Sequence, residues 1–288
     1  MRIFSRTRPE PPAREDPTAA LLRLLIETEK HPVKRIPEAE LESDARQVAA
    51  RLNTRLDALA SAEKEQQQFI ADVSHELRTP LTVLRGSLEV ALEEDRSAEE
   101  YREAIGNALL EVRHLTRLSQ NLLFLARGES GRVTLSFANI DLGPFIADVT
   151  RDLLPAAADR GIDLAAEVPD EPVRAFVDAG RMQQVLHNLL ENAIRYTGPE
   201  GRIRVRLFST PHEATIEVED SGIGIPAADQ PYVFERFFRS DRARRAYSGG
   251  SGLGLSIVRW IVEAHKGGVE VESAVDSGST FRVRLRLI

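Results

Sequence analysis

The sequence predicts a multidomain α+β protein in which an antiparallel helical hairpin is followed by a two-layer α/β sandwich. Three observations lead to this fold class. A run starting near residue 38 holds no Gly or Pro before Pro80, apolar residues then recur every three or four positions, and beyond residue 131 β-like runs alternate with helical ones. The first two patterns are typical of helices in bundles, and the third of helices packed on one face of a sheet.

Composition and charge restrict the class of protein. A chain of 288 residues corresponds to about two domains, and 42% hydrophobic with 29% charged residues is an ordinary globular profile. Lys and Arg number 38 against 45 Asp and Glu, so the net charge of −7 argues against direct nucleic-acid binding. The chain contains no cysteine, which excludes disulfide scaffolds, thiolate zinc sites and a cysteine nucleophile.

The N-terminal segment, residues 1–35, is predicted to be a disordered or poorly structured leader with one short helix at 19–26. Its first part is rich in Pro, Arg and acidic residues. The apolar stretch at 19–26 is far shorter than the roughly 20 residues that span a bilayer, and no apolar run follows the first arginines as in a secretory signal. We therefore expect no transmembrane segment in this chain and a cytoplasmic location.

The helical part begins with a predicted helix of roughly forty residues, from about residue 38 to Pro80. Pro80 is expected to loosen the helix because proline removes a backbone hydrogen bond. Beyond it the helical periodicity continues. One apolar stripe comprises Val73, Leu77, Leu81, Leu84, Leu88 and Ala91. After the break EEDRSAEE, a second stripe comprises Tyr101, Ile105, Ala108, Val112, Leu115, Ser119, Leu122 and Ala126. Such a hairpin, over residues 65–127, is expected to bury its apolar faces by pairing with a second copy into a four-helix bundle.

The segment RGESG at 127–131 marks a domain boundary, and residues 132–288 are predicted to form the sandwich. The expected strands are VTLSF, IDLAAEV, PVRAFV, RIRVRLF, ATIEVED, GVEVES and TFRVRLRL. Helices are expected after Asp141, across 179–195 and from about Gly252. This mixture of periods favours helices on one face of a single sheet.

His75, in FIADVSHELRTPLT, shares a predicted helix face with Arg78, Thr79 and Thr82, opposite the apolar stripe. It is therefore expected to point to solvent. A lone exposed histidine is most often a surface residue without a role. Thr79 on the same face and the adjacent Glu76 favour a second interpretation, because a neutral imidazole is a competent nucleophile and a nearby carboxylate fixes its tautomer.

Two further motifs suit a phosphorylated nucleotide. HNLLENAIRYT places Asn188 and Asn192 one helical turn apart, and paired amide oxygens suit Mg²⁺. In EDSGIGIP, Asp220 ends a predicted strand and can accept a hydrogen bond from the amine of adenine, while Gly222 and Gly224 let backbone approach a flat ligand. Each motif alone also fits a simpler structure, respectively a solvated helix face and a tight turn.

A third motif, GGSGLGLSIV at 249–258, leads glycines directly into a helix, whose free N–H groups form an anion site. It is neither a dinucleotide fingerprint nor a GK[ST] phosphate loop. The preceding segments FERFFR and SDRARRAYS are dense in arginine and are predicted to form a mobile lid that brings positive charge to a polyphosphate. A solvated basic loop is the alternative interpretation.

Taken together and in this order, the motifs resemble those of the sensor histidine kinases of two-component signalling. FIADVSHELRTPLT is similar to the H box of that family, HNLLENAIRYT to its N box and EDSGIGIP to its first glycine box. FERFFR is similar to the F box and GGSGLGLSI to the second glycine box. The resemblance covers residues 65–288 and implies a dimeric four-helix bundle followed by the Bergerat-type ATP-binding sandwich shared with gyrase-type ATPases.

The resemblance implies a role for each matching residue. His75 is the implied phosphoacceptor, Glu76 its acid–base partner, and Thr79 orients water during dephosphorylation of the partner. Asn192 and Asn188 are the implied Mg²⁺ ligands. Asp220 is implied to bind the adenine amine, with Gly222 and Gly224 lining the base. The other implied nucleotide-binding residues are Arg195, Tyr196, Arg239, Gly250, Gly252, Leu253 and Gly254. A Lys is common in the family where Arg195 stands, so the charge is kept and the geometry changes.

The function implied is an ATP- and Mg²⁺-dependent protein-histidine kinase that forms homodimers. It phosphorylates His75, passes the phosphoryl group to an aspartate in the receiver domain of a separate response regulator, and also acts as the phosphatase of that regulator. Residues 36–64 resemble a helical signal-transmitting linker. Two alternatives remain: a GHKL-type ATPase that uses ATP as a conformational clamp, and a catalytically silent dimeric scaffold.

Overall fold

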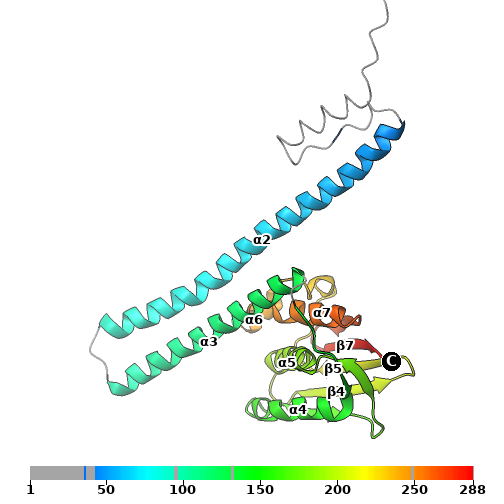
Figure 1. Cartoon of the computed structure of the whole chain (residues 1–288). Helices are drawn as coiled ribbons and strands as arrows, with labels where there is room; N and C mark the ends of the chain where they lie inside the picture. The colour runs from blue at the N-terminus through cyan, green and yellow to red at the C-terminus, as the bar shows by residue number, and fades with distance from the viewer. Residues whose placement is uncertain (1–35, 37–42, 94–96, 131–132, 248–249, 288) are drawn as a thin grey trace, which may run out of the picture. The chain divides into compact units, whose positions relative to one another are not determined.

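The computed structural model describes residues 36, 43–93, 97–130, 133–247 and 250–287. The predicted leader at 1–35, with its short helix at 19–26, lies outside the described residues. The chain divides into two compact units, Met1–Ser74 and His75–Ile288, and the division falls within the first long helix. Figure 1 shows a helical part followed by a part with a sheet, which confirms the predicted α+β class.

Helix α2 spans Ser43–Glu93 and continues through Pro80, so the expected helix of roughly forty residues ending near Pro80 is wrong in its length and its C-terminal end. Proline removes one N–H donor, but the turns on both sides keep their hydrogen bonds, and the hydroxyl groups of Thr79 and Thr82 donate to the carbonyls of His75 (3.4 Å) and Arg78 (2.8 Å). Within the described ranges, no helix has both the length and the hydrophobicity needed to cross a membrane.

Near the start of α2 the side chain of Asn53 binds the backbone of Ile36. The N–H of Ile36 donates to Asn53 Oδ1 at 2.8 Å, and Asn53 Nδ2 donates to the carbonyl of Ile36 at 2.9 Å. Both residues are buried. A buried amide that satisfies both its donor and its acceptor costs little, and it attaches Ile36 to the helix.

Helix α3 spans Ala98–Glu129 and begins at a capping box. Ser97 Oγ accepts from the N–H of Glu100 at 3.3 Å, and Glu100 Oε2 accepts from the N–H of Ser97 at 2.8 Å. These reciprocal bonds satisfy two of the N–H groups that a helix start leaves unpaired. The charged break that the sequence analysis identified thus separates α2 from α3.

The second part is a five-stranded mixed sheet in the order β2-β4-β5-β7-β6, accompanied by a two-stranded β1-β3 sheet. The strands are β1 (Ala138–Asp141), β2 (Asp163–Glu167), β3 (Arg174–Val177), β4 (Arg202–Ser209), β5 (Glu213–Asp220), β6 (Gly268–Ala274) and β7 (Gly278–Arg286). The helices are α4 (Leu142–Ala158), α5 (Ala179–Tyr196), α6 (Asp241–Ala246) and α7 (Gly254–Ala264), with one 3-10 turn, η2 (Gln230–Tyr232). All but one of the strands that the sequence predicted are present.

The exception is VTLSF at 133–137, which is not a strand; β1 starts one residue later. The N–H of Ser136 donates to Asp178 Oδ2 at 2.8 Å, so a side chain takes the place of a strand partner. The ring of Phe137 stacks on Phe176 with centroids 5.5 Å apart. Side-chain contacts thus hold this extended segment, and these could not be read from its alternation of residue types.

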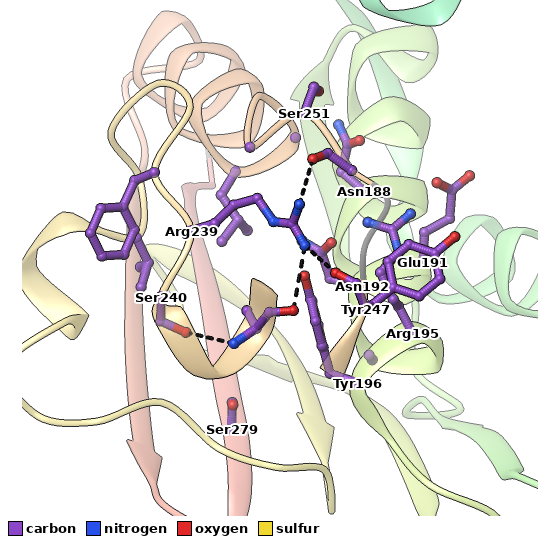
Figure 2. A pocket seen from close by; sticks show the side chains of 18 of the residues that line it. Asn188, Glu191, Asn192, Arg195, Tyr196, Arg239, Ser240, Tyr247, Ser251 and Ser279 are labelled. Carbon is purple, nitrogen blue, oxygen red and sulfur yellow. Dashed lines mark hydrogen bonds between the residues drawn. The ribbon is translucent and has the colours of Figure 1, made fainter. Parts of the chain in front are cut away.

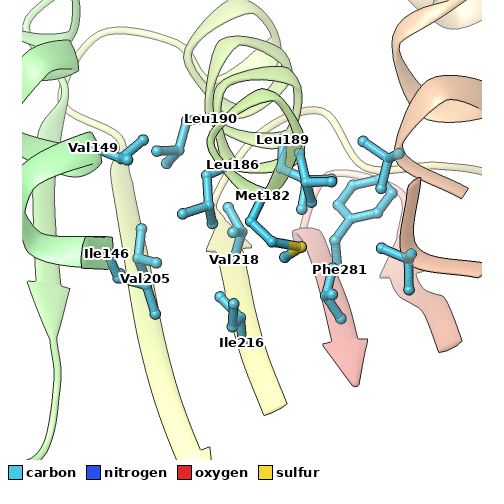
Figure 3. Close-up of a cluster of buried hydrophobic side chains, with 14 of the residues drawn as sticks. Ile146, Val149, Met182, Leu186, Leu189, Leu190, Val205, Ile216, Val218 and Phe281 are labelled. Carbon is cyan, nitrogen blue, oxygen red and sulfur yellow. The ribbon is translucent and has the colours of Figure 1, made fainter. Parts of the chain in front are cut away.

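The core lies between the sheet and helices α4, α5 and α7, which cover one face. Alternate residues of the central strands, among them Val205, Ile216, Val218 and Phe281, point toward Leu186 and its neighbours on α5 (Figure 3). Asp220 continues the inward alternation of β5, after Ile216 and Val218. The carboxylate at the end of β5 therefore lies on the helix-covered face of the sheet.

The opposite face of the sheet carries a lattice of ion pairs. Arg206 on β4 contacts Glu167 at 2.8 Å and Glu217 at 3.1 Å, and Arg282 on β7 contacts Glu217 and Glu272 at 2.8 and 2.7 Å. Opposite charges on adjacent strands stabilise the pairing register. The charged side chains also shield a sheet face that none of the described helices covers.

Candidate functional site

A cavity of about 450 Å³ opens in the unit that starts at His75. Its wall is formed by the outer side of α5, the end of β5, the loop that follows β5, the α6 segment and the start of α7 (Figure 2). Each of these elements carries one of the nucleotide motifs identified in the sequence. Segments far apart in the chain therefore converge on one concave surface.

Helix α5 contributes the asparagine pair because its two faces differ. Asp178 caps its first turn by accepting from the N–H of Arg181 at 3.1 Å, and Met182 and Leu186 face the sheet. Asn188 and Asn192 lie one turn apart on the cavity side.

The amide group of Asn188 can serve a bound metal–phosphate group. Its Nδ2 atom is buried and has no hydrogen-bond partner among the described residues, which leaves a donor for a phosphate oxygen. A Cβ atom added at Gly254 would lie 3.3 Å from Asn188 Oδ1, so the amide borders the start of α7. Two neutral amide oxygens beside a helix N-terminus are a donor set that suits Mg²⁺ together with phosphate oxygens. The residues present therefore fit the metal that the sequence implied.

Asp220 forms the floor of the cavity and is 7% exposed. Its Oδ1 accepts from the N–H of Gly222 at 2.8 Å. Burial raises the pKa of Asp220 to about 6, and hydrogen bonds from the backbone of Gly222 and Ser279 partly oppose that shift. The carboxylate is thus a buried acceptor whose charge state changes close to neutral pH.

The glycines make two close approaches that a side chain would prevent. Gly224 has a φ of +68° beside the backbone of Ala274, and Gly252 has a φ of +68°, with its Cβ position 2.8 Å from the Cα of Phe237. Both residues line the cavity. Glycine is the residue that adopts this conformation without strain. Because these turns carry no side chains, a ligand in the cavity can contact their backbone directly.

The α6 segment closes one side of the cavity. Ser240 caps α6 by accepting from the N–H of Ala243 at 3.1 Å. Arg239 Nη1 donates to the carbonyl of Gly250 at 3.0 Å, and its Nη2 donates to the carbonyl of Tyr247 (Figure 2). The guanidinium of Arg195 lies over the ring of Tyr247, 5.0 Å from its centroid. Both arginines therefore contact Tyr247, the residue that follows α6.

The cavity brings together most of the predicted nucleotide-binding residues. Those that line it are Asn188, Asn192, Arg195, Tyr196, Asp220, Gly224, Arg239, Gly250, Gly252 and Gly254. Gly222 and Leu253 do not line it. Gly222 packs against the carbonyl of Tyr196, and Leu253 is fully buried in the core beneath the start of α7.

The three predicted catalytic residues lie together on α2, on and beside one helix face. His75 and Thr79 are exposed and Glu76 is half-buried. Burial raises the pKa of Glu76, while the positive charge of Arg239 opposes the rise. His75 is thus accessible for reaction, as its position opposite the apolar stripe predicted.

Sequence reasoning missed the contribution of α3 to the cavity. Arg113, His114 and Arg117 from α3 line it, and Arg117 pairs with Glu191 at 3.3 Å. Leu118 and Leu125 are almost fully buried, at 1% and 2% exposure. Their spacing of seven was a readable signal of a second apolar stripe, beside the one at Ile105 and Val112 that we assigned to pairing.

Family models match both parts of the chain. Residues 65–131 match the "His Kinase A (phospho-acceptor) domain", and residues 177–288 match the "Histidine kinase-, DNA gyrase B-, and HSP90-like ATPase" domain. The first range contains His75 and the second contains the asparagine pair, Asp220 and the glycine turns.

Curated relatives match most of this chain. The chain is 39% identical over 258 residues to the probable sensor histidine kinase TcrY of Mycobacterium tuberculosis, an alignment that covers 87% of this chain and 54% of that protein. It is 36% identical to the sensor histidine kinase YclK of Bacillus subtilis, over 86% of this chain and 52% of that protein. The chain thus spans about half the length of these relatives.

Solved structures agree in fold. The histidine kinase ThkA in complex with the response regulator TrrA superposes with a TM-score of 0.65 and 26% identity, over 79% of this chain and 63% of that one. The histidine kinase AdeS of Acinetobacter baumannii gives a TM-score of 0.60 at 25% identity, over 74% and 97% of the two chains. With a phospho-acceptor domain, a histidine-kinase-type ATPase domain and these relatives, the chain belongs to the family of two-component sensor histidine kinases.

Proposed function

We propose that this chain is an ATP-dependent protein-histidine kinase that transfers the γ-phosphoryl group of ATP to His75. The observation that carries the proposal is the convergence of Asp220, the asparagine pair and the glycine turns on one cavity, in a chain that exposes His75 on a separate helix. A nucleotide site without an exposed acceptor suits an ATPase clamp, and an acceptor without a nucleotide site suits a scaffold. This chain has both.

Recognition of the base begins at Asp220. Its buried carboxylate accepts the N–H of Gly222 and keeps lone pairs for the exocyclic amine of adenine. Gly224 lets the chain lie flat against a planar ring. A guanine base presents a carbonyl oxygen instead of that amine, and the carboxylate would repel it, so the site selects adenine.

The phosphates are bound in the same cavity, at the part of its wall formed by the start of α7. The first N–H groups of α7, after Gly252 and Gly254, supply donors and the positive end of a helix dipole. Arg195 and Arg239 provide positive charge in the same cavity. Asn188 and Asn192 would hold Mg²⁺, which when bound neutralises charge on the phosphate oxygens.

In the proposed reaction a ring nitrogen of His75 attacks the γ-phosphorus. A P–N bond forms while the bond from the γ-phosphorus to the bridging oxygen breaks, and ADP leaves with that oxygen. The other ring nitrogen then loses its proton, and the adjacent carboxylate of Glu76 is the proposed acceptor. Burial raises the pKa of Glu76, which makes this carboxylate a better base than a fully solvated one.

The proposal extends to assembly and partners. Exposed apolar side chains on α2 and α3 support a homodimer whose hairpins, residues 65–127, form a four-helix bundle. The linker (36–64) and the catalytic domain (132–288) complete the proposed domain boundaries. ThkA binds a response regulator, and we propose the same class of partner, its receiver aspartate taking the phosphoryl group from His75. In the proposed phosphatase reaction, Thr79 would orient the water that hydrolyses the phosphorylated aspartate and releases inorganic phosphate. A cytoplasmic location fits the proposed use of ATP.

The test is incubation of the whole chain with γ-labelled ATP and Mg²⁺, followed by acid or alkali treatment. A phosphohistidine loses its label in acid and keeps it in alkali, whereas a serine phosphate is stable in acid. Acid-labile label on the protein supports the kinase. ATP hydrolysis without labelling would identify an ATPase clamp, and no nucleotide binding at all would identify a scaffold.

A further inference from the structure

Two arginines from different elements contact Tyr247, and they use different chemistry to do so (Figure 2). Arg239 binds the backbone, through the carbonyls of Gly250 and Tyr247. Arg195, near the end of α5, uses its flat guanidinium: its Cζ lies 5.0 Å from the centroid of the Tyr247 ring, and a Cβ at Gly250 would lie 3.2 Å from its Nη1. Its guanidinium therefore lies over the ring of Tyr247 and next to the space that a side chain at position 250 would occupy.

The two arginines differ in how many of their N–H donors form hydrogen bonds within the protein. Both terminal nitrogens of Arg239 donate to lid carbonyls. Arg195 lines the cavity, and its guanidinium forms no hydrogen bond or ion pair with another described residue. An aromatic ring that packs against the face of a guanidinium leaves the N–H groups at its edge free, because those donors lie in the guanidinium plane. Arg195 is thus a cation that is held in place and still has its donors available.

We propose that Tyr247 is a positioning residue for the nucleotide phosphates, acting through Arg195. The ring holds the guanidinium flat, so that its free edge is presented to phosphate oxygens as a two-pronged donor. This inference rests on the proposed ATP site and assigns to it Tyr247, the aromatic residue of the SDRARRAYS segment, to which the sequence analysis assigned no role of its own. A lysine at position 195 would keep the charge but would offer neither the flat face nor the fork.

The location of Tyr247 separates this role from a structural one. The residue is 41% exposed and follows the last turn of α6, where its N–H donates to the carbonyl of Ala243 at 3.1 Å. Its side chain is not part of the hydrophobic core. Removal of the ring is therefore expected to affect phosphate binding and to leave the free energy of unfolding nearly unchanged.

The experiment compares the dissociation constants of ATP and adenosine for the full chain and its Tyr247→Leu variant. An exposed cation–π contact corresponds to an affinity change of about two- to fivefold. Tyr247→Leu should raise the dissociation constant of ATP by that factor. The dissociation constant of adenosine, which has no phosphates, should stay unchanged. Tyr247→Phe keeps the ring and should bind like the wild type. Phe208→Leu, which removes an exposed aromatic ring on β4 outside the cavity (51% exposed, against 41% for Tyr247), is the control.

A second pair of variants tests whether the effect passes through Arg195. Arg195→Lys should weaken ATP binding, and Tyr247→Leu should then have no further effect in that background. Three results would each overturn the inference. The first is ATP binding by Tyr247→Leu that is as tight as that of the wild type or tighter. The second is a loss of affinity for adenosine as large as that for ATP, and the third is additive losses of ATP affinity in the double variant. A wild-type chain that binds no ATP would overturn the proposed function itself, which is a distinguishable result.

Discussion

The sandwich and the two long helices differ in the exposure of their large apolar side chains. In the sandwich, Leu186, Ile216 and Ile257 are at most 1% exposed. On the helices, Leu81 of α2 and Val112 of α3 are 51% and 45% exposed. A sheet covered by helices closes its own core, whereas a long amphipathic helix keeps an apolar stripe until another surface covers it. The difference is the one expected if the long helices associate with a second copy, as proposed, while the sandwich buries its own core.

Helix α3 has features of both regions. Leu118 and Leu125 are buried like residues of the sandwich core, while Ile105 and Val112 are about half exposed. Near its C-terminal end, Phe124 meets Trp260 of α7 edge to face at 4.9 Å, and Arg181 of α5 lies over the ring of Phe124. One helix thus carries a face that packs on the ATPase-type domain and a second face that remains available for a partner helix.

The largest expected effect separates the chemistry of the two regions. His75→Gln should abolish autophosphorylation, because an amide nitrogen is not nucleophilic, and should leave nucleotide affinity unchanged, because His75 does not line the cavity. Labelling with γ-labelled ATP and binding of a fluorescent nucleotide measure the two properties independently. Label retained on the variant would show that another residue is the acceptor.

The next effect tests association. Val112→Asp should convert a dimer into a monomer, because burying an unpaired carboxylate in an apolar bundle costs at least several kcal/mol. Light scattering measures the mass, and circular dichroism and ATP binding check that the sandwich stays folded. Val275→Asp is the matched control, since Val275 has almost the same exposure, 44%, but lies on the turn between β6 and β7.

The control should leave the dimer intact. If the wild type is already monomeric at micromolar concentration, or if Val112→Asp stays dimeric, then the exposed stripe on α3 does not serve dimerisation.

The third effect concerns the charge of Asp220. Its pKa is raised to about 6 by burial, and the charged form is the better acceptor for the adenine amine. Affinity for adenosine should therefore be constant above about pH 7 and fall by up to tenfold per unit well below pH 6. Adenosine is the suitable probe because it has no phosphates that titrate in this range. Asp220→Asn should bind more weakly at pH 8 and show no such dependence.

The same shift predicts the opposite trend for stability without ligand. A carboxyl group whose folded-state pKa lies above the unfolded value near 3.8 stabilises the fold while it is protonated, and this contribution is lost as pH rises through about 6. Asp220→Asn should accordingly raise the free energy of unfolding at pH 8. Denaturant titrations of the two proteins at pH 8 measure this difference, and a lower stability of the variant would contradict it.

The smallest expected effect is on dephosphorylation. Thr79→Ala should preserve autophosphorylation and slow the phosphatase reaction by about tenfold, since the exposed hydroxyl one turn from His75 can orient the attacking water. Thr82→Ala is the control, because Thr82 is also an exposed threonine bonded to the preceding turn of α2. An equal phosphatase rate in both variants would show that Thr79 has no specific role in the reaction.

Local sequence patterns predicted a large part of the candidate site. The four-residue spacing of Asn188 and Asn192, the strand that ends at Asp220 and the glycines before α7 are each local features, so each could be identified from a short stretch of chain. The error at 133–137 has the opposite cause. The bond from Ser136 to Asp178 joins residues 42 positions apart, and no local pattern reports such a contact.

The sequence by itself determined the element types, the exposure of His75 and the order of the motifs, because helical and strand periodicities arise from backbone geometry within a few residues. Only the tertiary structure decided that Arg113 and Arg117 of α3 line the cavity, that Tyr247 lies on Arg195, and that Leu253 enters the core although it lies between two glycines of the cavity. These facts depend on how α3, α5, α6 and α7 pack against one another. Packing is a property of surfaces that meet from distant parts of the chain, and it has no period in the sequence.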